Sequence, residues 1–265
     1  MIFETLEITR AGNGVATIWM NRPDVHNAFN AQLIADLTAA CQTFDTDESV
    51  RVVVLAGRGK SFSAGADLNW MKAAGNASIE ENLADAGRLT AMLRALAQLS
   101  KPTIARVHGA ALGGGLGLAA ACDICLAAAR AVFATSEVRF GIIPSAIGPY
   151  VLRAIGERQC YRYFQTAERI DAARAVAIGL AHDMAEDETA LDAKVAELVQ
   201  ALLAGGPKAQ AAAKDLIRGM ANRLLDDDLV HDTAQRIAHL RATPEAREGL
   251  DAFLAKRPAA WLARA

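Results

Sequence analysis

The 265-residue sequence lacks a long apolar run, a block of basic residues and a recognisable targeting segment. No apolar run reaches the roughly 18 residues that a membrane span requires, so we expect no membrane insertion. Lysine and arginine total 28 against 30 aspartate and glutamate residues, a net charge of −2, which argues against a nucleic-acid-binding surface as the main function. The opening residues, MIFETLEITR, resemble neither a signal peptide nor a transit peptide, so we expect a cytoplasmic protein.

Cysteine is also scarce, with Cys41, Cys122, Cys125 and Cys160 in the whole chain. Cys122 and Cys125 form a C-x-x-C motif, but no second ligand pair follows at the spacing of a structural zinc site. The motif also lacks the surroundings of a thioredoxin-like redox site. We therefore expect both cysteines to be small core residues on a strand, and we expect no metal site.

Apolar residues make up 52% of the chain, enough for a sizeable core. The stretch 14–21 is rich in β-branched and aromatic residues and predicts a strand. Apolar residues at helical spacing in 30–44 predict a helix capped by Asn30, and the continuous apolar run 50–57 predicts a strand buried on both faces. This strand–helix–strand order predicts an α/β fold with a right-handed crossover.

The last third of the chain differs, because helical periodicity dominates from about Asp171 and is broken at 205–207 and 243–245. The apolar stripe of the final predicted helix should pack on its own domain or on a neighbouring subunit. We expect two regions, an α/β core over residues 1–200 and a helical region over residues 201–265.

The most unusual stretch is GAALGGGLGLAAACD, residues 109–123, where glycine leaves the backbone bare. It lacks the Lys-Ser/Thr of a Walker loop and the G-x-G-x-x-G spacing of a dinucleotide-binding turn. Two interpretations remain: glycines that allow close packing, or N–H groups at a helix N-terminus that face a developing oxyanion.

Two further segments could complete such a site. The loop 59–71 follows a predicted strand and could present a second backbone donor, while its Asp67 is either a general base or, as we favour, a helix cap. Glu137 precedes an apolar loop, so partial burial would raise its pKa toward the range useful for proton transfer. The alternative for Glu137 is a structural ion pair with Arg139 or Arg153.

Together these segments resemble the crotonase (enoyl-CoA hydratase/isomerase) superfamily along the whole chain. The matching stretches are NRPDVHNAFN (21–30), SFSAGADL (61–68), KPTIARVHGAALGGGLGLAAACDI (101–124), SEVRFGIIPSAIG (136–148) and ATPEAREGLDAFLAKRPAAW (242–261). The resemblance implies a crotonase-like spiral core of ββα turns and a C-terminal helical region that builds homotrimers or hexamers. It implies an acyl-CoA substrate, with coenzyme A entering as part of the substrate and no separate cofactor.

By motif position, the resemblance places the two oxyanion donors on the N–H groups of Ala66 and Gly114 and the proton transfer on Glu137. Residues implied to bind coenzyme A are Val25, Ala64, Asp67 and Leu68, together with Phe253 and Lys256 reaching a neighbouring subunit's ligand. Trp70 and Met71 could line the acyl pocket or simply pack, and His108 is expected to be a hydrogen-bonded core histidine.

The sequence departs from the family pattern at Gly117, where typical hydratases carry a second catalytic glutamate. The sequence is most similar to bacterial methylglutaconyl-CoA hydratases of leucine breakdown, with isohexenylglutaconyl-CoA hydratases also similar. These substrates bear a second carboxylate, for which the candidate cations are Lys72, Arg88, Arg139 and Arg153. The expected activity is reversible hydration of such an enoyl-CoA. The alternatives are a Δ3,Δ2-enoyl-CoA isomerase that uses one glutamate and an inactive acyl-CoA-binding scaffold subunit.

Overall fold

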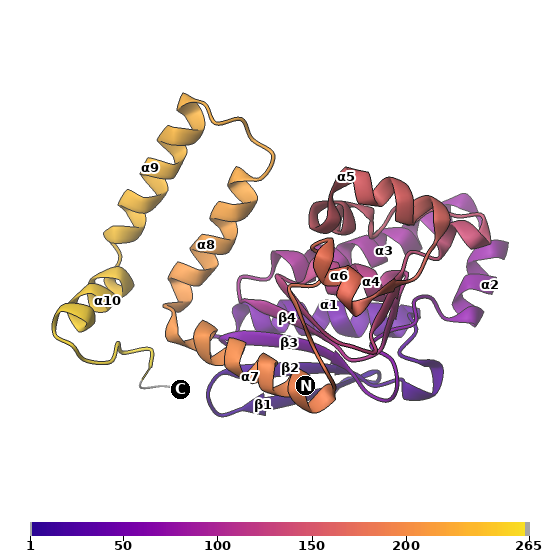
Figure 1. The fold of residues 1–265 in the computed structure, drawn as a ribbon, viewed down its shortest axis with the longest axis horizontal. Coiled ribbons are helices and arrows are strands. Elements are labelled where there is room, and N and C mark those ends of the chain that lie inside the picture. The colour runs from indigo at the N-terminus through magenta and orange to yellow at the C-terminus, as the bar shows by residue number, and fades with distance from the viewer. Residues whose placement is uncertain (1, 263–265) are drawn as a thin grey trace.

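The computed structural model describes residues 2–262 and has the expected α/β architecture (Figure 1). Its main sheet has the strand order β1-β2-β3-β4-β6-β9, in which β1 and β2 are antiparallel and the other neighbours are parallel. The strands are β1 (Leu6–Ala11), β2 (Val15–Met20), β3 (Val52–Gly57), β4 (Thr103–Val107), β6 (Ile124–Ala128) and β9 (Asp183–Ala185). The predicted strand–helix–strand unit is confirmed by β2, α1 (Ala31–Thr46) and β3, and the Asn30 side chain caps α1 at the N–H of Leu33.

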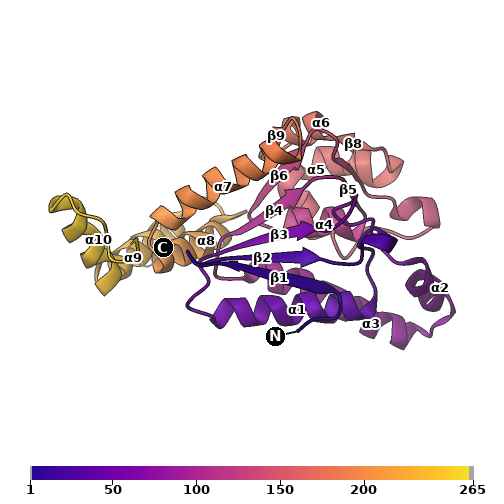
Figure 2. The same ribbon diagram turned by 90° about the horizontal axis from the view of Figure 1, so that it is seen from below.

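Helices cover both faces of this sheet (Figure 2). Val53 and Leu55 of β3 point to the main core beneath α1 and α3 (Ile79–Gln98). Val52 and Val54 point to the opposite face, which is covered by α7 (Glu188–Ala204). Residues alternate between the faces of a strand, so a strand buried on both sides reads as a continuous apolar run.

A second, smaller sheet carries the part of the chain that includes the glycine run. Its strands are β5 (Ala110–Leu112), β7 (Val132–Ala134) and β8 (Ile170–Asp171), in the order β5-β7-β8. The short, largely buried helix α4 (Gly114–Ala121) follows β5 after the single residue Gly113. The chain then passes through the 3₁₀ turn η2 (Glu137–Phe140) into α5 (Gly148–Thr166) and, after β8, into α6 (Ala172–Ala177).

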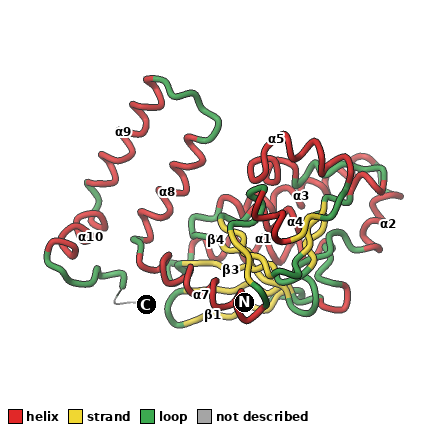
Figure 3. The backbone as a smooth tube through the Cα atoms, viewed as in Figure 1, coloured by secondary structure: helices red, strands yellow, loops and turns green. Residues whose placement is uncertain are grey.

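The C-terminal helices α8 (Pro207–Met220), α9 (Asp227–Arg241) and α10 (Pro244–Leu254) extend away from the sheet (Figures 1 and 3). The predicted helix breaks are confirmed, because Pro207 and Pro244 each begin a helix. Helical structure dominates after Asp171 as expected, with one strand, β9, that the sequence did not indicate. This three-residue strand joins the edge of the parallel sheet next to β6, a pairing that local periodicity does not reveal.

All four cysteines are free and buried. Burial raises the pKa of Cys125 to about 12 and that of Cys122 well above its ordinary value, so neither thiol is poised for redox chemistry. Cys125 lies on β6 as expected, whereas Cys122 lies at the C-cap of α4 and not on the strand. Within residues 2–262, no helix is long and apolar enough to cross a membrane.

Candidate active site

The loop after β3 lies alongside the strand that leads into α4. The Ser63 N–H donates to the Ala110 carbonyl at 3.0 Å, and the Leu112 N–H donates to the Ser63 carbonyl at 2.9 Å. At Gly115, a Cβ atom would lie only 2.2 Å from the Ser63 carbonyl oxygen, so the first turn of α4 requires a bare backbone here. The glycine run therefore serves close packing, and this packing brings the N-terminus of α4 to the 63–67 loop.

Phe29 organises the backbone donors at this junction. Its N–H donates to the Gly65 carbonyl at 2.6 Å, and its carbonyl accepts from the Asp67 N–H at 2.9 Å. The intervening Ala66 N–H has no acceptor among the described residues. The Phe29 ring also packs against Gly114, where a Cβ atom would lie 2.3 Å from the ring.

Gly114 is the first residue of α4, so its N–H cannot bond within the helix, and no acceptor for it is found in residues 2–262. The preceding Gly113 N–H donates instead to the Ala134 carbonyl at 2.8 Å. Helix N-termini carry partial positive charge, which favours a developing negative charge nearby. Ala66 and Gly114 thus lie on neighbouring segments, and the backbone N–H group of each has no acceptor among the described residues.

Glu137 reaches this junction from η2. Its Oε1 atom lies 3.3 Å from the place that a Cβ atom would occupy on Gly113. The Gly113 Cα atom in turn lies 3.8 Å from the position that a Cβ atom would take on Gly65. Both glycines have positive φ, +50° and +89°, a conformation that L side chains rarely adopt. The three segments predicted from the sequence therefore meet at one point.

The Glu137 carboxyl group is poorly hydrated. Its Oε2 atom is buried and has no hydrogen-bond partner, and burial raises the pKa of this carboxyl above its ordinary value. The alternative of an ion pair with Arg139 or Arg153 is not met. No salt bridge to Glu137 occurs in the described structure, and Arg139 donates to the Ala167 carbonyl at 3.0 Å. An unpaired, partly buried carboxyl group is suited to proton transfer.

The face of α4 next to this carboxyl group is apolar. A Cβ atom on Gly117 would lie 2.1 Å from Cγ2 and 2.7 Å from Cβ of Ile147, a side chain that is only 2% exposed. Ile147 therefore occupies the place from which a side chain at position 117 would extend. Sequence reasoning missed Ile147, because no local pattern links it to Gly117.

The four residues expected to contact coenzyme A from the core lie near one another. Val25 ends the turn η1 (Pro23–Val25), and the Ala64 N–H donates at 2.9 Å to the carbonyl of His26, which follows that turn. Asp67 is the N-cap of α2 (Leu68–Asn76), whose first residue, Leu68, is exposed. Their proposed role in binding remains a prediction.

Asp67 is held as a helix cap, the interpretation that the sequence favoured. Its side chain accepts from the Asn69 N–H at 2.9 Å and from Arg22 at 3.0 Å. Burial alone would raise the pKa of Asp67, but these hydrogen bonds outweigh it and lower the pKa below its ordinary value. A carboxylate so firmly ionised and paired is a poor general base.

Phe253 and Lys256 lie far from the junction of Ala66, Gly114 and Glu137 in this chain. Phe253 is 79% exposed on α10, which Figure 1 places at the opposite end of the molecule from α2. They do not join this chain's own site, so a role at a ligand held by a neighbouring subunit stays a prediction.

Other polar residues singled out in the sequence have structural surroundings. His108 is buried and its Nε2 lies 3.0 Å from the Gly59 carbonyl, as expected for a core histidine, and burial lowers its pKa. Trp70 is half-buried against the main core.

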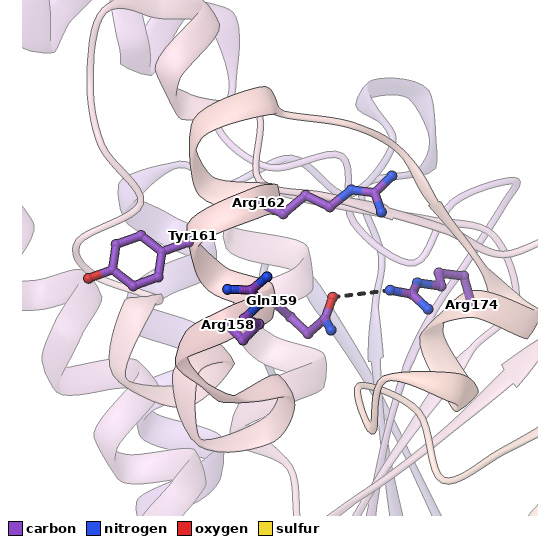
Figure 4. Close-up of a pocket in the computed structure, with 5 residues that line it drawn as sticks. All are labelled: Arg158, Gln159, Tyr161, Arg162 and Arg174. Atoms are coloured by element: carbon purple, nitrogen blue, oxygen red, sulfur yellow. Dashed lines mark hydrogen bonds between the residues drawn. The ribbon is translucent and has the colours of Figure 1, made fainter.

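A basic hollow of about 470 Å³ between α5 and α6 contains none of the predicted site residues (Figure 4). In it, Arg174 donates to Gln159 and Arg162 is paired with Glu168.

Comparisons with known proteins show the family to which this chain belongs. The enoyl-CoA hydratase/isomerase family profile matches residues 10–264. The crystal structure of an enoyl-CoA hydratase from Shewanella pealeana is 41% identical, covers 98% of this chain and 96% of that chain, and has a TM-score of 0.94. An enoyl-CoA hydratase of Alternaria alternata is 34% identical over 81% of this chain and 70% of its own. A 4-chlorobenzoyl coenzyme A dehalogenase of an Arthrobacter species is 31% identical over 92% of this chain and 88% of its own. The chain belongs to the enoyl-CoA hydratase/isomerase family, within the crotonase superfamily.

Proposed function

We propose that this protein catalyses reversible hydration of an enoyl-CoA thioester with Glu137 as its proton-transferring group. The observation that carries the proposal is the position of the Glu137 carboxyl group. Its Oε1 atom lies 3.3 Å from the position that a Cβ atom would take on Gly113, the residue that precedes α4. A carboxyl group there can exchange a proton with a substrate whose carbonyl oxygen is bound by the Ala66 and Gly114 N–H groups.

These positions support the following reaction. Ionised Glu137 removes a proton from water while the water oxygen bonds to Cβ of the enoyl group. The electron pair of the Cα–Cβ double bond moves toward the thioester, and the two N–H donors stabilise the resulting enolate oxygen. Glu137 then returns the proton to Cα, so atoms and charge balance and the carboxylate is regenerated.

For the substrate we propose 3-methylglutaconyl-CoA or a related glutaconyl-CoA, with Arg153 facing the distal carboxylate. Arg88 is paired with Asp85 at 2.7 Å, and Arg139 is bonded to the Ala167 carbonyl. Arg153 acts instead on Tyr150, whose pKa is raised by burial and partly lowered by the charges of Arg153 and Arg94. Tyr150 and Arg153 lie in the first turns of α5, directly after Ile147, and the Tyr150 N–H donates to the Ile147 carbonyl at 3.0 Å.

A Δ3,Δ2-enoyl-CoA isomerase is the second candidate, favoured by the Gly117–Ile147 contact. Isomerisation requires one group to remove and return a proton, and it needs no second carboxylate to orient water. An inactive scaffold subunit is less consistent with the free N–H donors and the unpaired Glu137 carboxyl group.

We further propose a cytoplasmic homotrimer or a hexamer built from two trimers. Large apolar side chains are exposed on the C-terminal helices and on the loop between α8 and α9, where a second copy could cover them. They are Leu224, Leu225, Leu250, Phe253 and Leu254. Such an assembly would also bring Phe253 and Lys256 to a neighbour's coenzyme A.

Turnover of the purified protein on a panel of enoyl-CoAs, in water labelled with ¹⁸O, tests these proposals. We expect label in the product and a preference for glutaconyl-CoA thioesters over their uncharged analogues. Double-bond migration without label would replace the hydratase proposal by the isomerase. Tight binding of coenzyme A thioesters without any turnover would favour the scaffold.

A further inference from the structure

Ile147 is buried at the start of α5 and makes an unusually demanding contact with α4. It is the residue before Gly148, and its backbone is helical, with φ −90° and ψ −20°. Rotation about its χ1 would move Cγ2 away from the Cβ place of Gly117, but not its own Cβ, which would remain 2.7 Å away. The pair therefore permits a side chain at 147 or at 117, and not at both.

Ile147 and Glu137 cover successive turns of the same short helix. The Gly117 N–H donates to the Gly113 carbonyl at 3.1 Å, so these glycines are one helical turn apart. Glu137 contacts the Gly113 end and Ile147 the Gly117 end. The two side chains thus reach α4 one turn apart, Glu137 from η2 and Ile147 from the start of α5, and these two elements contact each other.

We propose that Ile147 is a positioning residue that covers α4 beside Glu137 and keeps bulk water from its carboxyl group. The proposal rests on the proposed function, since it concerns the group that transfers the proton there. In consequence, Glu137 exchanges protons with the bound substrate and its water, and Ile147 takes the space from which a polar side chain at position 117 would otherwise extend.

The charged groups around Glu137 do not explain why its pKa is raised. On its own turn, Arg139 is bonded to the Ala167 carbonyl. On the 63–67 loop, Asp67 is paired with Arg22. On α5, Tyr150 and Arg153 are the nearest titratable groups along the chain, and α4 itself contains only glycine, leucine and alanine. Burial is the one cause that raises the Glu137 pKa, because no neighbouring charge contributes to the shift.

Thermal unfolding without substrate tests whether side chains at positions 117 and 147 exclude each other. We expect Gly117→Ala to lower Tm by several degrees, about 3–10 °C for a clash of this kind in a chain of this size. Ile147→Gly and Ile147→Ala should each lower Tm on their own, because a buried side chain is lost. Combined with Gly117→Ala, Ile147→Gly should lower Tm by less than the sum of the two single changes, and Ile147→Ala should show less of this compensation, because alanine keeps the Cβ atom at 2.7 Å. Additive changes in Tm would contradict the exclusive packing of positions 117 and 147.

The effect on Glu137 is tested by its titration and by pH profiles. Ile147→Ala and Ile147→Gly should move the acid-side inflection of kcat/KM to lower pH, since water would stabilise the ionised carboxylate. Ile147→Val, which retains the β-branch, should keep the wild-type profile. Val151→Ala, a somewhat smaller truncation of a buried side chain one turn along α5 at a residue 1% exposed, should lower stability and leave the inflection unchanged.

The same inflection can be followed in free enzyme from the carboxyl ¹³C signal that disappears in Glu137→Gln. An unchanged Glu137 titration in Ile147→Gly, or an equal change in Val151→Ala, would overturn the role of Ile147. If the wild-type protein turned over no enoyl-CoA, the proposed function would fail while this titration still decided the role of Ile147.

Discussion

Glu137 lies against Gly113, with its Oε1 atom 3.3 Å from the place that a Cβ atom would occupy. This contact joins η2 to the N-terminus of α4, and Gly65 lies on the other side of Gly113. The carboxyl group is thereby held next to two backbone N–H groups that have no acceptor within residues 2–262. The arrangement leads to specific expectations for variants.

Gly113→Ala should impair catalysis more than binding. The added methyl group would press on the Glu137 carboxyl and would require alanine at φ +50°. We expect kcat to fall by about 10²-fold, the size of effect that a displacement of about 1 Å can cause, with a smaller change in KM. Steady-state kinetics provide the measurement, and a variant with unchanged kcat would contradict the contact's importance.

Gly114→Pro and Gly114→Ala form a matched pair that tests the N–H donor. Both substitutions add a Cβ atom toward the Phe29 ring, but only proline removes the N–H group. Proline is tolerated at the first position of a helix, so the two variants should fold similarly. We expect kcat for the proline variant to be about 10²–10³-fold below that of the alanine variant. Equal rates at equal stability would exclude the Gly114 N–H as an oxyanion donor.

Asp67 should contribute to stability and not to proton transfer. Asp67→Asn retains an acceptor for the Asn69 N–H and should keep turnover within a few-fold of wild type. Asp67→Ala removes the cap of α2 and should lower the free energy of unfolding by about 1 kcal/mol. Chemical denaturation and kinetics on the two variants separate these roles. A large loss of kcat in Asp67→Asn would restore this residue as a candidate base.

The raised pKa of Glu137 predicts a defined pH dependence of stability. Between the ordinary glutamate pKa and the raised value, the folded protein retains a proton that the unfolded chain has released. The free energy of unfolding contributed by this group therefore falls as pH rises through that window. Glu137→Gln should remove this slope and be more stable than wild type above the window. Denaturation curves at a series of pH values would show whether the slope persists.

Much of the fold and three parts of the site were predictable because they depend on local patterns. The apolar run of β3, the Asn30 cap and the glycine run each indicate their structure through neighbouring residues. Ala66 and Gly114 were assigned through the family resemblance and Glu137 through its apolar surroundings; the structure brings their segments together, and their catalytic roles stay predictions. Such signals are reliable when short-range physics and the final packing agree.

The remaining features depend on contacts between distant segments. Nothing near Ile147 in the sequence shows that its Cβ lies beside Gly117, and β9 is defined only by its pairing with β6. Phe29 likewise acquires its role from bonds to Gly65 and Asp67. Residue type cannot reveal these contacts, because they are set by how the strands and helices pack.

The central claim is that Glu137 carries the proton to and from the substrate Cα atom. Its most direct test is the rate of deuterium incorporation at Cα of a bound enoyl-CoA substrate in D₂O, compared between wild type and Glu137→Gln. The geometry predicts steady incorporation by the wild-type protein and a loss of at least about 10²-fold in the variant, with substrate binding retained. Equal incorporation by both proteins would contradict the account.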